Sequence, residues 1–197
     1  MVALLAIACG LLQLSPAAFA QAASGGKWIT IFDGKSLKGW NPIGTTNWRL
    51  GGGVVQADQG AGFLVSSASY ADFQLRAQIW VDDAANSGVF IRCENPLEVT
   101  AANAYEVNVY DKRPDQAYRT GAIVDIAKPL AQVNAGGKWN TLEITAQGSH
   151  FIVTLNGTRT ADATDAKHTG GRIALQYGAG VNNAGIVKFR KVEIRTF

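Results

Sequence analysis

Alternating apolar and polar positions dominate this chain and predict β-strands. The clearest run spans residues 73–81, where every second residue is apolar and the residues between are Gln74, Arg76, Gln78 and Trp80. Successive side chains of a strand point to opposite faces of its sheet, so the apolar set predicts a face in the core. The other face is then exposed to solvent or to a ligand.

Further strands are predicted wherever similar runs are bounded by turn residues. These runs are 88–93, 105–110, 121–125, 139–146, 150–155, 171–176 and 186–195. Asn156-Gly157 is the strongest hairpin signal, because both residues tolerate the positive φ of a type I′ turn. Helical periodicity is scarce, and strands of this length separated by turns predict an all-β fold of two packed antiparallel sheets, a sandwich or jelly roll.

The length and the first residues of the chain set its expected organisation. A chain of 197 residues with 47% hydrophobic content supports one domain with a substantial core, which we place at 27–197. Residues 1–20 are apolar and uncharged and end in Ala-Phe-Ala, which predicts a signal peptide followed by a flexible stub at 21–26. A membrane anchor is the alternative, but the apolar run is interrupted by polar residues. We therefore expect an exported protein, periplasmic or extracellular, with no membrane span after cleavage.

Charge and cysteine content narrow the partners. The net charge of +3 is spread along the chain without a basic run, so nucleic acid is not expected as a partner and a polar neutral ligand fits better. Outside the predicted leader Cys93 is the only cysteine, which excludes an internal disulfide and a cysteine metal cluster. The acidic turn at Asp82 and Asp83 could take a divalent cation such as calcium, although an Asx-turn is the more common reading and no metal site is assigned.

Two predicted strands carry polar side chains that would meet on one face. The period of two places Glu106, Asn108 and Tyr110 together, and on run 88–93 it leaves Phe90 and Arg92 on the matching face if the two strands pair. An arginine beside a glutamate suits sugar hydroxyls, because the guanidinium donors and carboxylate acceptors are held in fixed geometry. A simple cross-strand ion pair is the alternative.

Aromatic residues offer a second route to carbohydrate. The chain has five tryptophans, and Trp80 is the best candidate for stacking on a sugar ring because it lies on the polar side of its strand, with Gln78 beside it. Most tryptophans, however, are partly buried packing residues. No serine elbow, Cys/His pair, phosphate loop or dinucleotide fingerprint is present, so acyl, phosphoryl and hydride transfer have no support.

Short motifs in order along the chain resemble the 3-keto-disaccharide hydrolase domain family. They are FDGKSLKGW at 32–40, NSGVFIR at 86–92, YEVN at 105–108, TGAI at 120–123, GKWN at 137–140, LNG at 155–157, GRIALQ at 171–176 and VKFRKV at 187–192. The resemblance implies a concanavalin A-like jelly roll, secretion, and action on glycosides whose C3 hydroxyl has been oxidised to a ketone.

That reaction requires a base and a group that stabilises an enolate, because a C3 ketone acidifies the C2 hydrogen and lets the group at C1 leave by elimination before water adds. The resemblance points to Glu106 as the base or acid, to Arg92 as the cation near the developing oxyanion, and to Asp111 as a second acid. The expected carbohydrate-binding residues are Asn108, Tyr110, Trp80, Gln78, Gln176 and Lys112.

Two departures from the family pattern keep other functions open. Asn108 stands where the family usually has Gln, and Val124 stands where it often has an aromatic residue, so a lectin-like carbohydrate-binding module without catalysis is the main alternative. A retaining endo-glucanase on the same fold would need two carboxylates about 5 to 5.5 Å apart. The residue after Glu106 on the same face is Asn108, so this reading ranks lower.

Overall fold

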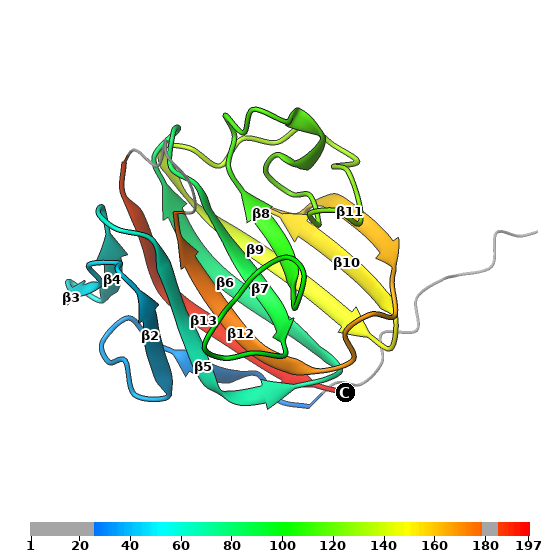
Figure 1. The fold of residues 1–197 in the computed structure, drawn as a ribbon, viewed down its shortest axis with the longest axis horizontal. Helices are drawn as coiled ribbons and strands as arrows, with labels where there is room; N and C mark the ends of the chain where they lie inside the picture. Colours follow the sequence, from blue (N-terminus) through cyan, green and yellow to red (C-terminus); the bar gives the residue numbers. More distant parts are fainter. Residues whose placement is uncertain (1–25, 179–184) are drawn as a thin grey trace, which may run out of the picture.

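The structure is a computed structural model that describes residues 26–178 and 185–197. It confirms the predicted all-β sandwich (Figure 1). The elements are β1 (Ile29–Phe32), β2 (Trp40–Gly44), β3 (Arg49–Gly51), β4 (Val54–Ala57), β5 (Gly62–Tyr70), β6 (Phe73–Val81), β7 (Ser87–Cys93), β8 (Tyr105–Val109), the 3₁₀ turn η1 (Gln116–Tyr118), β9 (Lys138–Gln147), β10 (His150–Leu155), β11 (Thr158–Thr164), β12 (Gly171–Tyr177) and β13 (Val187–Thr196).

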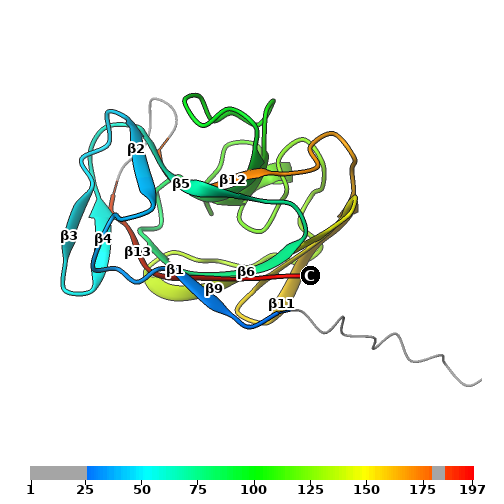
Figure 2. The ribbon, with the colours of Figure 1, turned by 90° about the horizontal axis from the view of Figure 1, so that it is seen from below.

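Two antiparallel sheets form two layers (Figure 2). The eight-stranded sheet has the order β11-β10-β9-β6-β13-β4-β3, with β1 also paired to β13. The five-stranded sheet has the order β2-β5-β12-β7-β8. Its outer face carries the loop after β7, which is drawn in green on the side away from the eight-stranded sheet.

The core lies between the sheets and follows the predicted alternation. The apolar residues of β6 are 0 to 2% exposed, and the apolar residues of β9 and β13 pack beside them. The predicted turn between β10 and β11 is confirmed, because Asn156 and Gly157 both have positive φ, 52° and 81°. Cys93 is buried as well, at 1% exposed.

The predicted strand 121–125 is instead an irregular segment along the edge of β8. Val124 N–H donates to the Glu106 carbonyl, and Ile123 forms a single bridge with Val107. The chain then reverses tightly, with Asp125 at a φ of 62° and Ala127 N–H bonded to Ile123 carbonyl oxygen. This reversal ends the pairing before a regular ladder can form.

A bulge at the end of β7 overturns the predicted orientation of Arg92. Phe90 pairs with Ala174 and Cys93 pairs with Arg172, so two residues of β7 face the single Ile173 of β12. Arg92 occupies this bulge with a φ of 53°, and its side chain turns inward, where it is 1% exposed. The prediction that Arg92 shares a face with Glu106 is therefore wrong.

Inside the sandwich the Arg92 guanidinium joins three connections at one end of the two sheets. Its Nε donates to Ala71 O at 3.0 Å, and Nη1 donates to Gly148 O at 2.8 Å and His168 O at 2.9 Å. Its Nη2 lies 3.1 Å from Asp72 Oδ1. These bonds make Arg92 a structural link between the β5–β6, β9–β10 and β11–β12 connections.

The N-terminal predictions concern residues that the structure does not describe. The predicted signal peptide at 1–20 and nearly all of the predicted stub at 21–26 lie outside the described residues. Within the described ranges, no helix is long and apolar enough to cross a membrane.

Candidate functional site

The outer face of the five-stranded sheet brings polar side chains of three neighbouring strands together. Phe90 on β7 pairs with Glu106 on β8, as predicted, and with Ala174 on β12. In the next row, Gly88 lies between Asn108 and Gln176. The alternation of β8 puts Val107 in the core, so Glu106 and Asn108 both face outward.

A cleft of about 290 Å³ opens over these rows. It is lined by Asn86, Glu106, Tyr110, Arg113, Pro114 and Gln176. Three of the residues predicted for the site, Glu106, Tyr110 and Gln176, are therefore brought together.

Glu106 is the one carboxyl group among the residues that line this cleft. Its side chain is buried, with 8% of the residue exposed. Burial raises the pKa of Glu106 to about 7, and the negative charge of Asp125 adds to the rise, while the guanidinium of Arg113 opposes it. Arg113 Nη1 lies 3.9 Å from Glu106 Oε1, too far for a direct hydrogen bond. Glu106 is thus half-ionised near neutral pH, which is the state that serves proton transfer best.

A buried acceptor, the side-chain oxygen of Gln176, belongs to the same cleft as Glu106. Gln176 Oε1 is buried and has no hydrogen-bond partner among the described residues. Gly88 lies beside this oxygen, and a side chain there would be too close, because its Cβ would lie 3.4 Å from Gln176 Oε1 and 2.9 Å from Val107 O. A buried acceptor without a partner is costly, so a ligand hydroxyl that donates to Gln176 would relieve that cost.

Asn108 lies deeper than predicted. The residue is completely buried, and its Nδ2 donates to Tyr118 O at 2.6 Å, beneath the loop that follows β8. Its Oδ1 has no hydrogen-bond partner among the described residues. Asn108 does not line the cleft, and it acts on the site by holding Tyr118 and its loop.

Asp111 and Lys112 also differ from their predicted roles. Both carboxylate oxygens of Asp111 are used within the chain: Oδ1 accepts from Thr120 Oγ1 at 2.5 Å, and Oδ2 accepts from Ala135 N and Gly136 N, each at 2.9 Å. Asp111 therefore fastens the two ends of the loop between β8 and β9 and is not placed as a second acid. Lys112 points to solvent, with its Nζ 3.8 Å from Asp83 Oδ2.

Trp80 and Gln78 lie on the other side of the molecule. They belong to β6, in the eight-stranded sheet, and they alternate with the buried residues of that strand, so their side chains face away from the core. Trp80 pairs with Trp139 and Lys188 on the neighbouring strands. The prediction that Trp80 and Gln78 contribute to the same site as Glu106 is wrong, because period-two alternation gives a face of a strand but not the sheet to which it belongs.

Arg113 was missed by sequence reasoning. It takes the place beside Glu106 that was predicted for Arg92, and its side chain is 25% exposed. The available signal was its position in Asp111-Lys112-Arg113-Pro114, directly after β8, where a loop can fold back over the strand.

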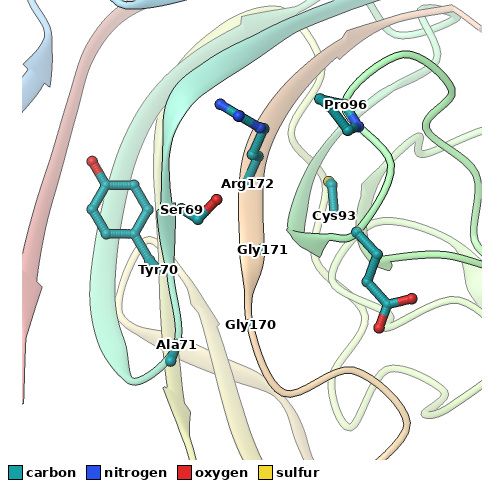
Figure 3. A pocket seen from close by; sticks show the side chains of 9 residues that line it. Ser69, Tyr70, Ala71, Cys93, Pro96, Gly170, Gly171 and Arg172 are labelled. Carbon is teal, nitrogen blue, oxygen red and sulfur yellow. The ribbon is translucent and has the colours of Figure 1, made fainter.

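A second hollow of about 570 Å³ lies at the opposite end of the same sheet face (Figure 3). Its wall includes Ser69, Tyr70, Cys93, Glu94 and Arg172. The loop 94–104 separates it from the Glu106 cleft by packing Val99 and Ala104 over Phe90 and Ala174.

The polar groups that line this second hollow are bonded within the chain, and its thiol is unreactive. Arg172 donates to the carbonyl oxygens of Ser66 and Ser67. Burial raises the pKa of the Cys93 thiol to about 12, so it is not a nucleophile at neutral pH. Glu94 Oε1 lies 2.9 Å from Nδ1 of the buried His168. The Glu106 cleft is therefore the stronger candidate.

A metal centre finds no support in the donor sets. No group of three or more His, Cys, Asp or Glu side chains within residues 26–178 and 185–197 could hold a metal ion. At the acidic turn, where an Asx-turn was the favoured reading over a divalent cation, Asp82 Oδ2 accepts the N–H of Ile186 at 2.7 Å.

Comparison with known protein families identifies the family of this chain. Residues 27–195 match the pattern of the 3-keto-alpha-glucoside-1,2-lyase-like domain. The chain belongs to this family. A 3-keto-disaccharide hydrolase of Bacteroides thetaiotaomicron is 25% identical over 151 residues, which cover 59% of this chain and 51% of that protein. The chain thus spans about half the length of this curated relative.

Solved structures share the fold. A presumed glycosyl hydrolase of Parabacteroides distasonis superposes with a TM-score of 0.72 and 23% identity, covering 87% of this chain and all of that one. The carbohydrate-binding module CBM66 of Bacillus subtilis has a TM-score of 0.61 and 24% identity, with coverage of 80% and 96%. Winged bean acidic lectin has a TM-score of 0.59 and 10% identity, with coverage of 86% and 98%. The family member described here therefore has the sandwich of lectins and of carbohydrate-active proteins.

Proposed function

We propose that this chain cleaves 3-keto-glycosides in the Glu106 cleft by elimination followed by addition of water. The observation that carries the proposal is the buried carboxyl group of Glu106, whose pKa is raised to about 7 and which faces the cleft. The chain also belongs to the 3-keto-alpha-glucoside-1,2-lyase-like family. The relative in Bacteroides thetaiotaomicron is a 3-keto-disaccharide hydrolase, and the family is named for its likeness to a 3-keto-alpha-glucoside-1,2-lyase. Both names fit a reaction that begins with the removal of a proton.

In the proposed mechanism, ionised Glu106 removes the proton at C2, next to the C3 ketone. The electron pair of the C2–H bond forms an enolate with its charge on the C3 oxygen. The C1–O bond then breaks, its electrons leave with the aglycone oxygen, and a proton from the neutral Glu106 carboxyl neutralises that oxygen. Water adds across the C1–C2 double bond, with hydroxyl at C1 and a proton at C2, which yields the free 3-keto sugar.

Three residues that line the cleft with Glu106 support these steps. Arg113 brings a positive charge into the same cleft, where it opposes the negative charge that develops on the enolate oxygen. Tyr110 and Gln176 also line the cleft, and the unpaired Oε1 of Gln176 can accept from a sugar hydroxyl. Binding of the sugar would then place its C2 hydrogen at the carboxylate.

Carbohydrate binding without catalysis is the second candidate. It is favoured by Val124, which bonds to Glu106 through its backbone and stands where the family pattern suggests an aromatic ring, and by the shared fold of the module CBM66. A binding module needs no group with a pKa near 7. The two functions therefore differ in whether substrate is consumed.

We also propose that the protein acts outside the cytoplasm, after removal of residues 1–20. The apolar segment ending in Ala18-Phe19-Ala20 supports this proposal. Cell fractionation with mass determination of the N-terminus tests it. A full-length chain in the cytoplasmic fraction would contradict export.

A matched pair of substrates tests the proposed activity. The protein is expected to release nitrophenol from a nitrophenyl 3-keto-glucoside and to leave the corresponding unoxidised glucoside intact, because only the ketone acidifies the C2 hydrogen. Absorbance of nitrophenolate, in the α and β series, measures release. Binding of the keto-glucoside by calorimetry without any release would favour the binding module, and equal release from both glucosides would exclude the elimination route.

A further inference from the structure

Tryptophans and basic side chains interleave on the outer face of the eight-stranded sheet, on strands β6, β9 and β13. Lys188 Nζ lies 4.6 Å from the ring centroid of Trp80, and Arg190 Cζ lies 4.2 Å from that of Trp139. At the other end of this face, Trp28 is contacted by Arg76 at 4.2 Å and by Arg195 at 5.0 Å. We call this surface the basic aromatic face.

The positive charge of this face is not balanced. The outward positions of its three strands hold five basic side chains, namely Arg76, Lys188, Arg190, Lys191 and Arg195, and two acidic ones, Glu143 and Glu193. These basic residues come from separate parts of the sequence, and the fold brings them together on one surface.

The two glutamates account for two of these cations. Arg76 pairs with Glu143 at 2.7 Å and Lys191 pairs with Glu193 at 2.8 Å. The remaining three, Lys188, Arg190 and Arg195, have no acidic partner among the described residues. Two of them are oriented by glutamine side chains: Arg190 Nε donates to Gln78 Oε1 and Arg195 Nε donates to Gln74 Oε1, each at 2.6 Å. Their outer guanidinium nitrogens stay available for an anion.

The polarity of the face favours a polar anionic ligand over a lipid surface. Among the described residues, the large hydrophobic side chains that remain exposed are Ile29, Leu50, Leu97, Leu130 and Phe197, and none of them lies on β6, β9 or β13. A surface that binds a bilayer inserts apolar side chains, whereas each tryptophan of this face lies under a basic side chain, so a lipid headgroup layer is disfavoured. A polar hollow of about 230 Å³, lined in part by Trp28, Gln74 and Arg195, adds hydrogen-bonding groups.

We propose that the basic aromatic face binds an anionic polysaccharide, one that carries carboxylate or sulfate groups along a chain of sugar rings. The unpaired cations would hold the acidic groups, and the glutamine amides and tryptophan edges would meet the hydroxyls and ring hydrogens. The two sheets form separate layers (Figure 2). The face lies on the eight-stranded sheet and the Glu106 cleft on the five-stranded one, so a bound polymer would leave the cleft open. The proposal therefore does not depend on the proposed catalytic function.

Affinity electrophoresis of the full chain in gels that contain polygalacturonate, with neutral dextran as the comparison polymer, tests this inference. The protein is expected to be retarded by polygalacturonate and not by dextran, and to lose the retardation at high NaCl, since the screening length falls from about 10 Å at 0.1 M to about 3 Å at 1 M. The double variant Lys188→Gln/Arg190→Gln is expected to bind about tenfold or more weakly, because it removes two charge-assisted contacts.

The control variant Lys128→Gln/Lys167→Gln removes the same charge from exposed positions elsewhere and should keep wild-type affinity. Thermal unfolding and tryptophan fluorescence of both variants check that the fold is intact. Equal weakening of both variants would overturn the proposal, because net charge alone would then explain binding. Absence of retardation would also overturn it, as would binding to phosphatidylglycerol vesicles or nucleic acid in preference to polygalacturonate.

Discussion

Replacing Glu106 with glutamine is expected to abolish cleavage of 3-keto-glucosides and, at the same time, to stabilise the folded chain above neutral pH. Loss of an acid-base group typically lowers the rate by about 10² to 10⁴. The gain in stability follows from burial: Glu106 has a pKa of about 7 in the folded chain, well above the value of 4.5 for an unperturbed glutamate. The neutral amide of glutamine fills a similar volume without a charge.

The sign of the pH effect is set by the folded state, which binds the Glu106 proton more tightly than the unfolded state does. The free energy of unfolding of the wild type should therefore fall between pH about 4.5 and pH about 7 and be constant above, by about 3 kcal/mol from this group. Glu106→Gln should lack this decline. Urea denaturation from pH 4 to pH 8 measures it.

Glu98→Gln is the matched control for both effects, because Glu98 is an exposed carboxyl in the loop after β7. It should leave the rate and the pH dependence of stability unchanged. Retained cleavage by Glu106→Gln would remove Glu106 from the chemistry. A Glu106→Gln variant that is less stable than the wild type at pH 8 would show that the carboxylate is stabilised by contacts other than those described.

Replacing Arg92 with lysine or methionine is expected to lower the free energy of unfolding by about 3 to 5 kcal/mol. The buried guanidinium bonds to three carbonyl oxygens and to Asp72, and its Cζ lies 5.0 Å from the ring centroid of Phe151. Lysine keeps the charge but not the planar set of donors, so at least one carbonyl oxygen would stay unpaired. Burial lowers the pKa of Arg92 from its usual high value. The same burial would lower the pKa of a lysine at this position and favour its neutral form.

Arg159→Lys provides the comparison, since Arg159 pairs with Asp162 at the surface and such pairs contribute less than about 1 kcal/mol. Chemical denaturation of the three variants gives the differences directly. Cleavage by the Arg92 variants, measured well below their unfolding temperature, should stay near the wild-type rate. A stable Arg92→Lys variant without cleavage would instead place Arg92 in the reaction.

The strands could be predicted because their alternation reports burial directly. β6 coincides with the predicted run 73–81 and β10 with 150–155, and each has one face in the core. Two features escaped this reasoning for physical reasons. The bulge at Arg92 adds one residue to β7 and reverses the face of its side chain, and no pattern of polar residues marks that insertion. The segment 121–125 has strand composition, but its tight turn limits it to one bridge.

The site was predicted as far as one strand reaches. Glu106 and Tyr110 were identified because the period of two along the predicted run 105–110 needs no knowledge of the sheet. Trp80 and Asp111 were misplaced because their positions depend on which sheet holds β6 and on how the loop after β8 closes. Arg113 was missed for the same reason, since only the folded loop brings it beside Glu106. Long-range pairing, more than local pattern, decides which polar groups meet.

The central claim is that the cleft removes a proton from C2, and isotope exchange tests it most directly. A 3-keto-glucoside incubated with the protein in deuterium oxide is expected to yield a released 3-keto sugar with deuterium at C2, and a C2-deuterated substrate is expected to react several times more slowly. Both effects should vanish in Glu106→Gln. Release of the aglycone at the same rate from both substrates, with the original hydrogen retained at C2, would contradict the account.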